Sequence, residues 1–103
     1  MANLTSLPNL DGYRTPFRGN PRLHEELAWF ASEDDRFLGV LIRDRLDRDF
    51  SWVVLARDES TGIYRAIDLA ASRPTAAVAK DELQSAIRSW ADRPATEVVE
   101  ALR

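Results

Sequence analysis

Runs of apolar residues bounded by charged turns predict β-strands in the middle of the chain. Phe37–Arg43 and Ser51–Arg57 are rich in Val, Ile, Leu and aromatic residues, and both end in charge. A third such run, Ile63–Ala70, follows the loop 58–62, where Gly62 stands at a position that favours a positive φ. Because the connections between these runs are short, we expect consecutive antiparallel strands, that is, a β-meander.

The segment 23–32 fits two alternatives. Apolar residues at helical spacing follow the pair Asn20 and Pro21, which is a good start for a helix. Against this, the apolar run 27–31 is short and aromatic, and an acidic turn follows it at once. We favour a first strand over a helix here, because three strand-like segments come next.

The apolar period changes to that of a helix after Pro74. Thr75 is a candidate N-cap, and Ala76–Trp90 is dense in helix-forming residues. Thr96 is a candidate cap for a last short turn over 97–102. The predicted helix carries one apolar stripe, formed by Val78, Leu83, Ala86, Ile87 and Trp90.

The first 22 residues differ in composition from the rest. They hold three of the five prolines and two of the four glycines, which rules out a long helix or a central strand. We therefore expect an extended arm over 1–22 and a single α+β domain over 23–103. The expected fold is an antiparallel β-meander of three to four strands with the C-terminal amphipathic helix packed on one face. The arm either docks on that sheet or a partner, or is a partly disordered terminus.

Both faces of the strand Ser51–Arg57 are apolar. Trp52 and Val54 point to one side of the sheet, and Val53 and Leu55 point to the other. A single helix covers only one of these faces. The second face therefore needs another cover, which is either the arm or a partner protein, including a second copy of the chain.

Composition narrows the function. With 103 residues the chain has the size of one domain, and without cysteine it has neither disulfides nor thiolate metal sites. A net charge of −3 argues against a general nucleic-acid binder. The N-terminus has no signal-peptide pattern, and no apolar run approaches the ~20 residues that a membrane-spanning helix needs. We expect a cytoplasmic protein with no membrane association.

No group of residues matches a known catalytic pattern. His24 is the only histidine, and no nucleophile-elbow sequence or glycine-rich phosphate loop is present. The acidic cluster Asp44, Asp47 and Asp49 alternates with arginines, so we expect a solvated, self-paired loop and not a metal site. The sequence thus predicts a protein that is not an enzyme and has no cofactor, no metal and no catalytic residues.

The stretch from Phe37 to Thr75 carries a resemblance. Its runs Phe-Leu-Gly-Val-Leu-Ile-Arg-Asp-Arg, Asp-Phe-Ser-Trp-Val-Val-Leu-Ala-Arg-Asp-Glu and Tyr-Arg-Ala-Ile-Asp-Leu resemble short proteins and terminal modules of bacterial mobile elements. Small anti-CRISPR inhibitors occur among proteins of this size and style. The resemblance covers about a third of the chain, and it implies a small inhibitor or regulator without assigning a role to any residue.

Two functions follow as hypotheses. The first is a non-enzymatic module that binds a protein and occludes its surface, with a homodimer as a further option. The second is an accessory nucleic-acid binder that uses the arm for phosphate contact and stacking. The candidate protein-binding residues are Glu33, Asp34, Asp35, Asp44, Asp47, Asp49, Trp29 and Trp52. The candidate nucleic-acid-binding residues are Arg14, Arg18, Arg22, Tyr13 and Phe17.

Overall fold

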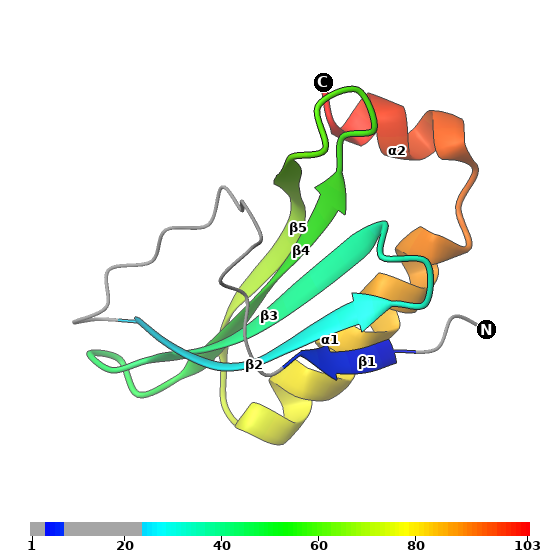
Figure 1. Cartoon of the computed structure of the whole chain (residues 1–103). Coiled ribbons are helices and arrows are strands. Elements are labelled where there is room, and N and C mark those ends of the chain that lie inside the picture. The colour runs from blue at the N-terminus through cyan, green and yellow to red at the C-terminus, as the bar shows by residue number, and fades with distance from the viewer. Residues whose placement is uncertain (1–3, 8–23) are drawn as a thin grey trace.

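A computed structural model describes residues 4–7 and 24–103, which form one antiparallel sheet and two helices (Figure 1). The strands follow one another in the sheet in the order β1-β2-β3-β4-β5. The predicted α+β fold with a β-meander is therefore confirmed, and β1 adds an edge strand from within the predicted arm. The elements are β1 (Leu4–Leu7), β2 (His24–Ser32), β3 (Phe37–Asp44), β4 (Phe50–Arg57), β5 (Tyr64–Arg73), α1 (Ala76–Ala91) and α2 (Ala95–Ala101).

The strands β2 and β5 can be compared with the sequence predictions for the same segments. In the segment 23–32, for which we favour a strand over a helix, the described residues His24–Ser32 form β2, which pairs with β1 on one side and β3 on the other. The last strand is longer than the predicted Ile63–Ala70, because β5 continues to Arg73, which pairs with Phe50 of β4. Residues 71–73 are small or polar, so the apolar pattern stops before the backbone ladder does.

The helix α1 begins as predicted. The Thr75 side chain accepts a hydrogen bond from the Val78 amide at 3.1 Å, which satisfies one of the free donors of the first turn. The predicted apolar stripe is wrong at one position, since Val78 is 40% exposed and Ala79 is buried in its place. Successive residues are ~100° apart around a helix, so one residue's shift turns Val78 away from the sheet.

The helix α2 starts one residue before the expected cap. Pro94 precedes its first turn, and no side chain makes a capping hydrogen bond there, so the prediction that Thr96 caps this turn is wrong. Proline suits the start of a helix, where an amide donor would have no partner. Of the α2 residues, Val98 is buried.

The face of the sheet under α1 holds the larger core, which we call the helix-face cluster. Gly39 of β3 lies at its centre, where a Cβ atom would stand 2.5 Å from Ile87 Cδ1 and 2.7 Å from Leu83 Cδ1. The missing side chain thus allows α1 to approach the strand closely. The buried members of this cluster are Phe30, Phe37, Leu41, Trp52, Val54, Ala56, Ala79, Leu83, Ile87, Trp90 and Val98.

The opposite face carries a second core, which we call the far-face cluster. Alternation in β4 divides its residues as predicted, because Trp52 and Val54 belong to the helix-face cluster and Val53 and Leu55 to the far-face cluster. No helix residue takes part in the far-face cluster. The expectation that the arm 1–22 or a partner covers this face stays a prediction, because residues 1–3 and 8–22 lie outside the described residues and the described part, β1, lies in the sheet itself. The buried members are Trp29, Ala31, Leu38, Val40, Ile42, Val53, Leu55 and Tyr64.

Polar partners fix the buried tryptophans of the helix-face cluster. Trp52 Nε1 donates to Glu82 of α1 at 3.1 Å, and Arg73 at the end of β5 donates to the same carboxylate at 2.6 Å. Trp90 Nε1 donates to the Asp68 carboxylate at 3.1 Å, and the other oxygen of Asp68 accepts the amide of the following residue at 2.9 Å. These bonds tie α1 to the edge strand β5 and leave no indole donor of the cluster unsatisfied.

The substitution Gly39→Ala tests the close approach of α1 to β3. We expect it to lower the free energy of unfolding by ~1–3 kcal/mol, because the added methyl group overpacks a buried contact. Urea unfolding followed by tryptophan fluorescence measures the loss. The control Leu46→Ala removes an exposed side chain and should change the free energy of unfolding by less than ~0.5 kcal/mol. A Gly39→Ala protein as stable as the parent would contradict the packing described.

Candidate functional site

The loop between β4 and β5 is a compact turn built around Asp58. The Asp58 carbonyl accepts hydrogen bonds from the amides of Thr61 at 3.2 Å and Gly62 at 2.7 Å. Its side chain accepts both the amide and the hydroxyl of Ser60, at 3.0 and 2.6 Å. Gly62 has φ +73°, so the positive φ predicted for this position is confirmed. The loop is therefore held by its own hydrogen bonds.

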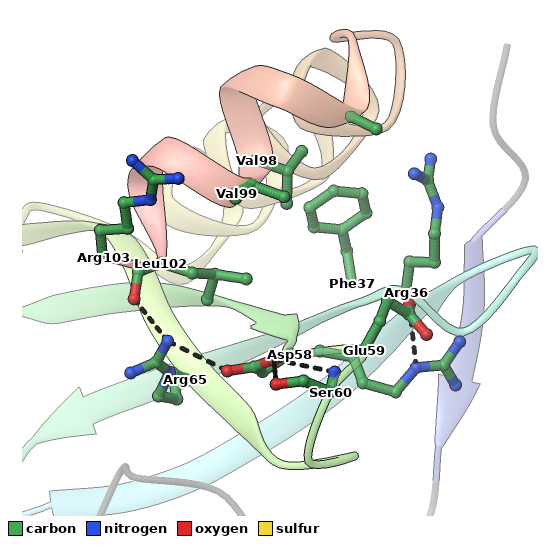
Figure 2. Close-up of a pocket in the computed structure, with 12 residues that line it drawn as sticks. Arg36, Phe37, Asp58, Glu59, Ser60, Arg65, Val98, Val99, Leu102 and Arg103 are labelled. Atoms are coloured by element: carbon green, nitrogen blue, oxygen red, sulfur yellow. Dashed lines mark hydrogen bonds and ion pairs between the residues drawn. The ribbon is translucent and has the colours of Figure 1, made fainter.

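The C-terminal end of α2 is joined to this loop by one arginine. Arg65 of β5 donates from Nη2 both to the carbonyl of Leu102 and to the Asp58 carboxylate, the latter at 3.2 Å. Figure 2 shows the guanidinium between these two acceptors. On its inner side α2 is anchored by Val98, which is buried in the helix-face cluster.

A cavity of about 360 Å³ lies between α2, the β4–β5 loop and the start of β3, and we call it the α2 groove. Phe37 and Val98 are buried beneath it, whereas Val99 is 51% exposed. The volume is at the lower end of the range for ligand pockets and fits one or two side chains. Its apolar lining consists of Phe37, Ala95, Val98, Val99 and Leu102 (Figure 2).

Four arginines also line the groove, and each has a carboxylate partner. Arg36 pairs with Asp34 at 2.6 Å, and Arg57 pairs with Glu59 at 3.3 Å. Arg65 pairs with Asp58 and Arg103 with Glu100, at 3.2 and 3.3 Å. The site thus combines an apolar floor with a rim of arginine–carboxylate ion pairs.

Two groups of the groove have displaced pKa values. The hydrogen bonds from Ser60, with the charge of Arg65 adding to them, lower the pKa of Asp58 below its ordinary value. Burial alone would lower the pKa of Arg57, but the hydrogen bond and charge of Glu59 outweigh it and raise the value. Asp58 is therefore anionic and Arg57 cationic at neutral pH.

The acidic turn Glu33, Asp34 and Asp35 connects β2 to β3 and leads directly into Arg36 of the groove. Asp34 accepts hydrogen bonds from the Ser32 hydroxyl at 2.8 Å and from Arg36, so it orders the turn itself. Burial of Asp34 raises its pKa, but these hydrogen bonds outweigh the burial and leave the pKa lowered. The turn therefore lies beside the groove, while its role in binding stays a prediction.

The second predicted acidic group, Asp44, Asp47 and Asp49, lies in the β3–β4 turn at the opposite end of the sheet from the groove (Figure 1). The three carboxylates are within 4.8 Å of one another, and Asp44 accepts the amides of Leu46 and Asp47. The expected pairing of these aspartates with the arginines of their own loop is wrong among the described ion pairs. Arg43 and Arg45 instead pair with Glu25 of β2, at 2.7 and 3.7 Å. A neighbouring strand thus supplies the counter-charge.

The predicted aromatic contacts are less available than the sequence suggested. Trp29 and Trp52 are both buried, on opposite faces of the sheet. Trp29 Nε1 donates to Glu26 at 2.9 Å, and Trp52 Nε1 donates to Glu82. Both indoles are therefore part of the core and expose little surface for contact with a partner. The candidates Arg14, Arg18, Arg22, Tyr13 and Phe17 lie outside the described residues.

His24 does not form a catalytic pair with a serine among the described residues. It begins β2, and its Nε2 is 3.9 Å from the Asp44 carboxylate. The hydroxyls of Ser32 and Ser60 donate to Asp34 and Asp58 instead. The histidine also lies at the end of the sheet away from the groove, because it pairs with Asp44 across β2 and β3.

Sequence reasoning missed the groove. Its two valines, Val98 and Val99, are adjacent in the predicted last turn 97–102, but Val98 is buried and Val99 is half-exposed at the cavity. The arginines that line the cavity come from the β2–β3 turn, β4, β5 and the segment after α2, so no local pattern joins all four. The one local signal was an apolar pair in a short, charged C-terminal segment.

Comparison with known proteins adds no relative. The chain matches no protein-family model, and neither a curated protein nor a solved structure is found to be similar. Within residues 4–7 and 24–103, neither helix is long and apolar enough to cross a membrane. The site is therefore interpreted from its own geometry.

The loss of stability at acid pH tests whether the Asp58 carboxylate stabilises its turn. The folded-state pKa of Asp58 is lowered, so its contribution to stability is present above the ordinary value and is lost as the pH falls below about 4. We expect the melting temperature of Asp58→Asn to fall less between pH 6 and pH 3 than that of the parent. Calorimetry at each pH measures this. The control Asp47→Asn, in a distant turn, should follow the parent, and parallel curves for Asp58→Asn and the parent would contradict the assignment.

Proposed function

We propose that the protein is a non-enzymatic protein-binding module and that the α2 groove is part of its contact surface. The observation that carries this proposal is an apolar cavity with a half-exposed valine, lined by four arginines. Protein interfaces combine an apolar centre with a polar rim, and arginine is among the residues enriched in them. The acidic turn 33–35 extends the rim on one side.

Binding is favoured over catalysis by how the charged groups of the groove are used. Asp58 is held by Ser60 and Arg65, and Asp34 by Ser32 and Arg36. Carboxylates held in the anionic form by several donors are poor proton donors near neutral pH. They are well suited, however, to keep guanidinium groups in place around an apolar contact.

The biological role proposed with this surface is that of a small cytoplasmic inhibitor or regulator that occludes the surface of its partner. The support is the resemblance of residues 37–75 to modules of bacterial mobile elements, including anti-CRISPR-like inhibitors. The size of the chain fits this mode of action, because a domain of 103 residues can cover a partner's site without chemistry of its own.

Photo-crosslinking tests the groove directly. A photoreactive amino acid at Val99 should crosslink to a partner in host lysate, whereas the same group at Val78 should not, since Val78 is 40% exposed but lies on α1 away from the groove. With the partner identified by mass spectrometry and purified, Val99→Asp should weaken binding about tenfold. Titration calorimetry measures the affinity.

Both substitutions, Val99→Asp and Val78→Asp, should change the free energy of unfolding by less than about 0.5 kcal/mol, because neither side chain is buried in the core. Equal crosslinking at the two positions would remove the groove from the interface. A crosslink between two copies of the chain would identify the partner as a homodimer.

The alternative function, accessory binding of nucleic acid through the arm, makes a different prediction. Three arginines over 1–22 and a net charge of −3 support only weak, salt-sensitive contact with phosphates. We expect no complex with duplex DNA at about 0.15 M salt in a fluorescence anisotropy titration. A submicromolar complex that weakens steeply with added salt would favour the alternative over the protein-binding module.

A further inference from the structure

The arginines of the α2 groove differ in how firmly they are held. Arg65 is held firmly within the structure, because it binds both the Leu102 carbonyl and Asp58, whose side chain is only 24% exposed. Arg57 and Arg103 are paired with Glu59 and Glu100, which are 67% and 70% exposed. Ion pairs with such exposed partners contribute little and exchange readily. Two guanidinium groups on the rim are therefore available to a new anion.

The geometry of these two pairs leaves donors unused. Arg57 meets Glu59 through Nε, and Arg103 meets Glu100 through Nη1. Arg57 also makes a side-chain hydrogen bond with Tyr64, which helps to hold its side chain at the rim. Each guanidinium carries five N–H donors in a planar fork, so donors besides those of these bonds can bind a carboxylate.

The groove restricts the charge that it can accept. Asp58 lies in its wall and is fixed in the anionic form by Ser60 and Arg65, and Glu59 adds a second negative charge. With Asp34 and Glu100, these carboxylates balance the four arginines, so the rim has no net positive charge to attract a polyanion such as a nucleic-acid backbone. A single carboxylate adds one negative charge, far less than a polyanion does, and it can take the place of Glu59 or Glu100 beside one arginine because both glutamates are exposed and can turn into solvent.

We propose that the α2 groove binds a protein segment in which a carboxylate stands next to an aliphatic or aromatic side chain. The apolar side chain enters the cavity between Phe37 and Val99, and the carboxylate pairs with Arg57 or Arg103. This assignment rests on the proposed function, because it names the chemistry of the partner at the same site.

Synthetic peptides test the assignment. The probe is an acetylated, amidated octapeptide with one acidic-apolar pair, Gly-Ser-Ser-Asp-Leu-Ser-Ser-Gly, with three matched peptides in which Asn replaces Asp, Lys replaces Asp, or Ser replaces Leu. Titration into ¹⁵N-labelled full-length protein should move the amide signals of Val98, Val99 and Leu102. We expect affinity to fall about fivefold to tenfold with Asn and further with Lys or with Ser.

Protein variants separate the charge from the cavity. The double variant Arg57→Gln with Arg103→Gln should bind the acidic peptide no better than the parent binds the Asn peptide. It should leave the affinity for the Asn peptide unchanged. The control Arg45→Gln removes an exposed arginine at the other end of the sheet and should bind like the parent. Signal shifts outside the groove, or equal affinity for the Asp and Lys peptides, would overturn the assignment.

Two outcomes distinguish this inference from the function on which it rests. If Val99 crosslinks to a partner but the peptides show no preference for Asp, the acidic-apolar chemistry is wrong and the binding module stands. If neither crosslinking nor peptide binding involves the groove, both the inference and the proposed function are wrong. Titration of sodium 4-phenylbutyrate tests whether the natural ligand is a small molecule. Tighter binding of this carboxylate than of any peptide would overturn the choice of a protein segment.

Discussion

The close packing of α1 on β3 at Gly39 is the contact on which the rest of the structure depends. Because no side chain separates the strand from Leu83 and Ile87, the helix lies low on the sheet and buries its inner stripe completely. That position brings Glu82 to Trp52 and Trp90 to Asp68, so the helix is also joined to the strands through hydrogen bonds. The short segment after α1 then places α2 beside the β4–β5 loop, where the groove forms (Figure 1).

Much of the fold could be predicted from the sequence because its local signals agree with one another. The strand-like runs, Gly62 in the hairpin loop and the Thr75 cap each specify one local structure. The errors fall where local signals are weak. The cap of α2 was assigned to Thr96 on residue type alone, and β5 was ended at the last apolar residue although its ladder continues to Arg73.

The candidate site could not be predicted in the same way, because it is made by the tertiary arrangement. Arg57 and Arg65 flank the β4–β5 loop, whereas Arg103 lies far from them in the chain, and each has an acidic neighbour at short range that makes it look like an ordinary surface residue. The tryptophans were the opposite case. They drew attention as large aromatic residues, but their indole donors have acceptors inside the structure and their rings are buried. The residue type shows which contacts a side chain can make, but its burial decides whether a partner can reach it.

The Asp68 side chain has a consequence for how the protein behaves at high concentration. The strand β5 forms one edge of the sheet, and an exposed edge of ten residues is a template for another β-strand. One carboxylate oxygen of Asp68 engages the amide of Leu69, and the other holds the Trp90 indole. An incoming strand that pairs with the Leu69 amide must displace the Asp68 oxygen that already accepts it, and it then meets the carboxylate charge at the middle of this edge. The residue that holds the Trp90 indole thus also makes this edge a poorer template for strand addition.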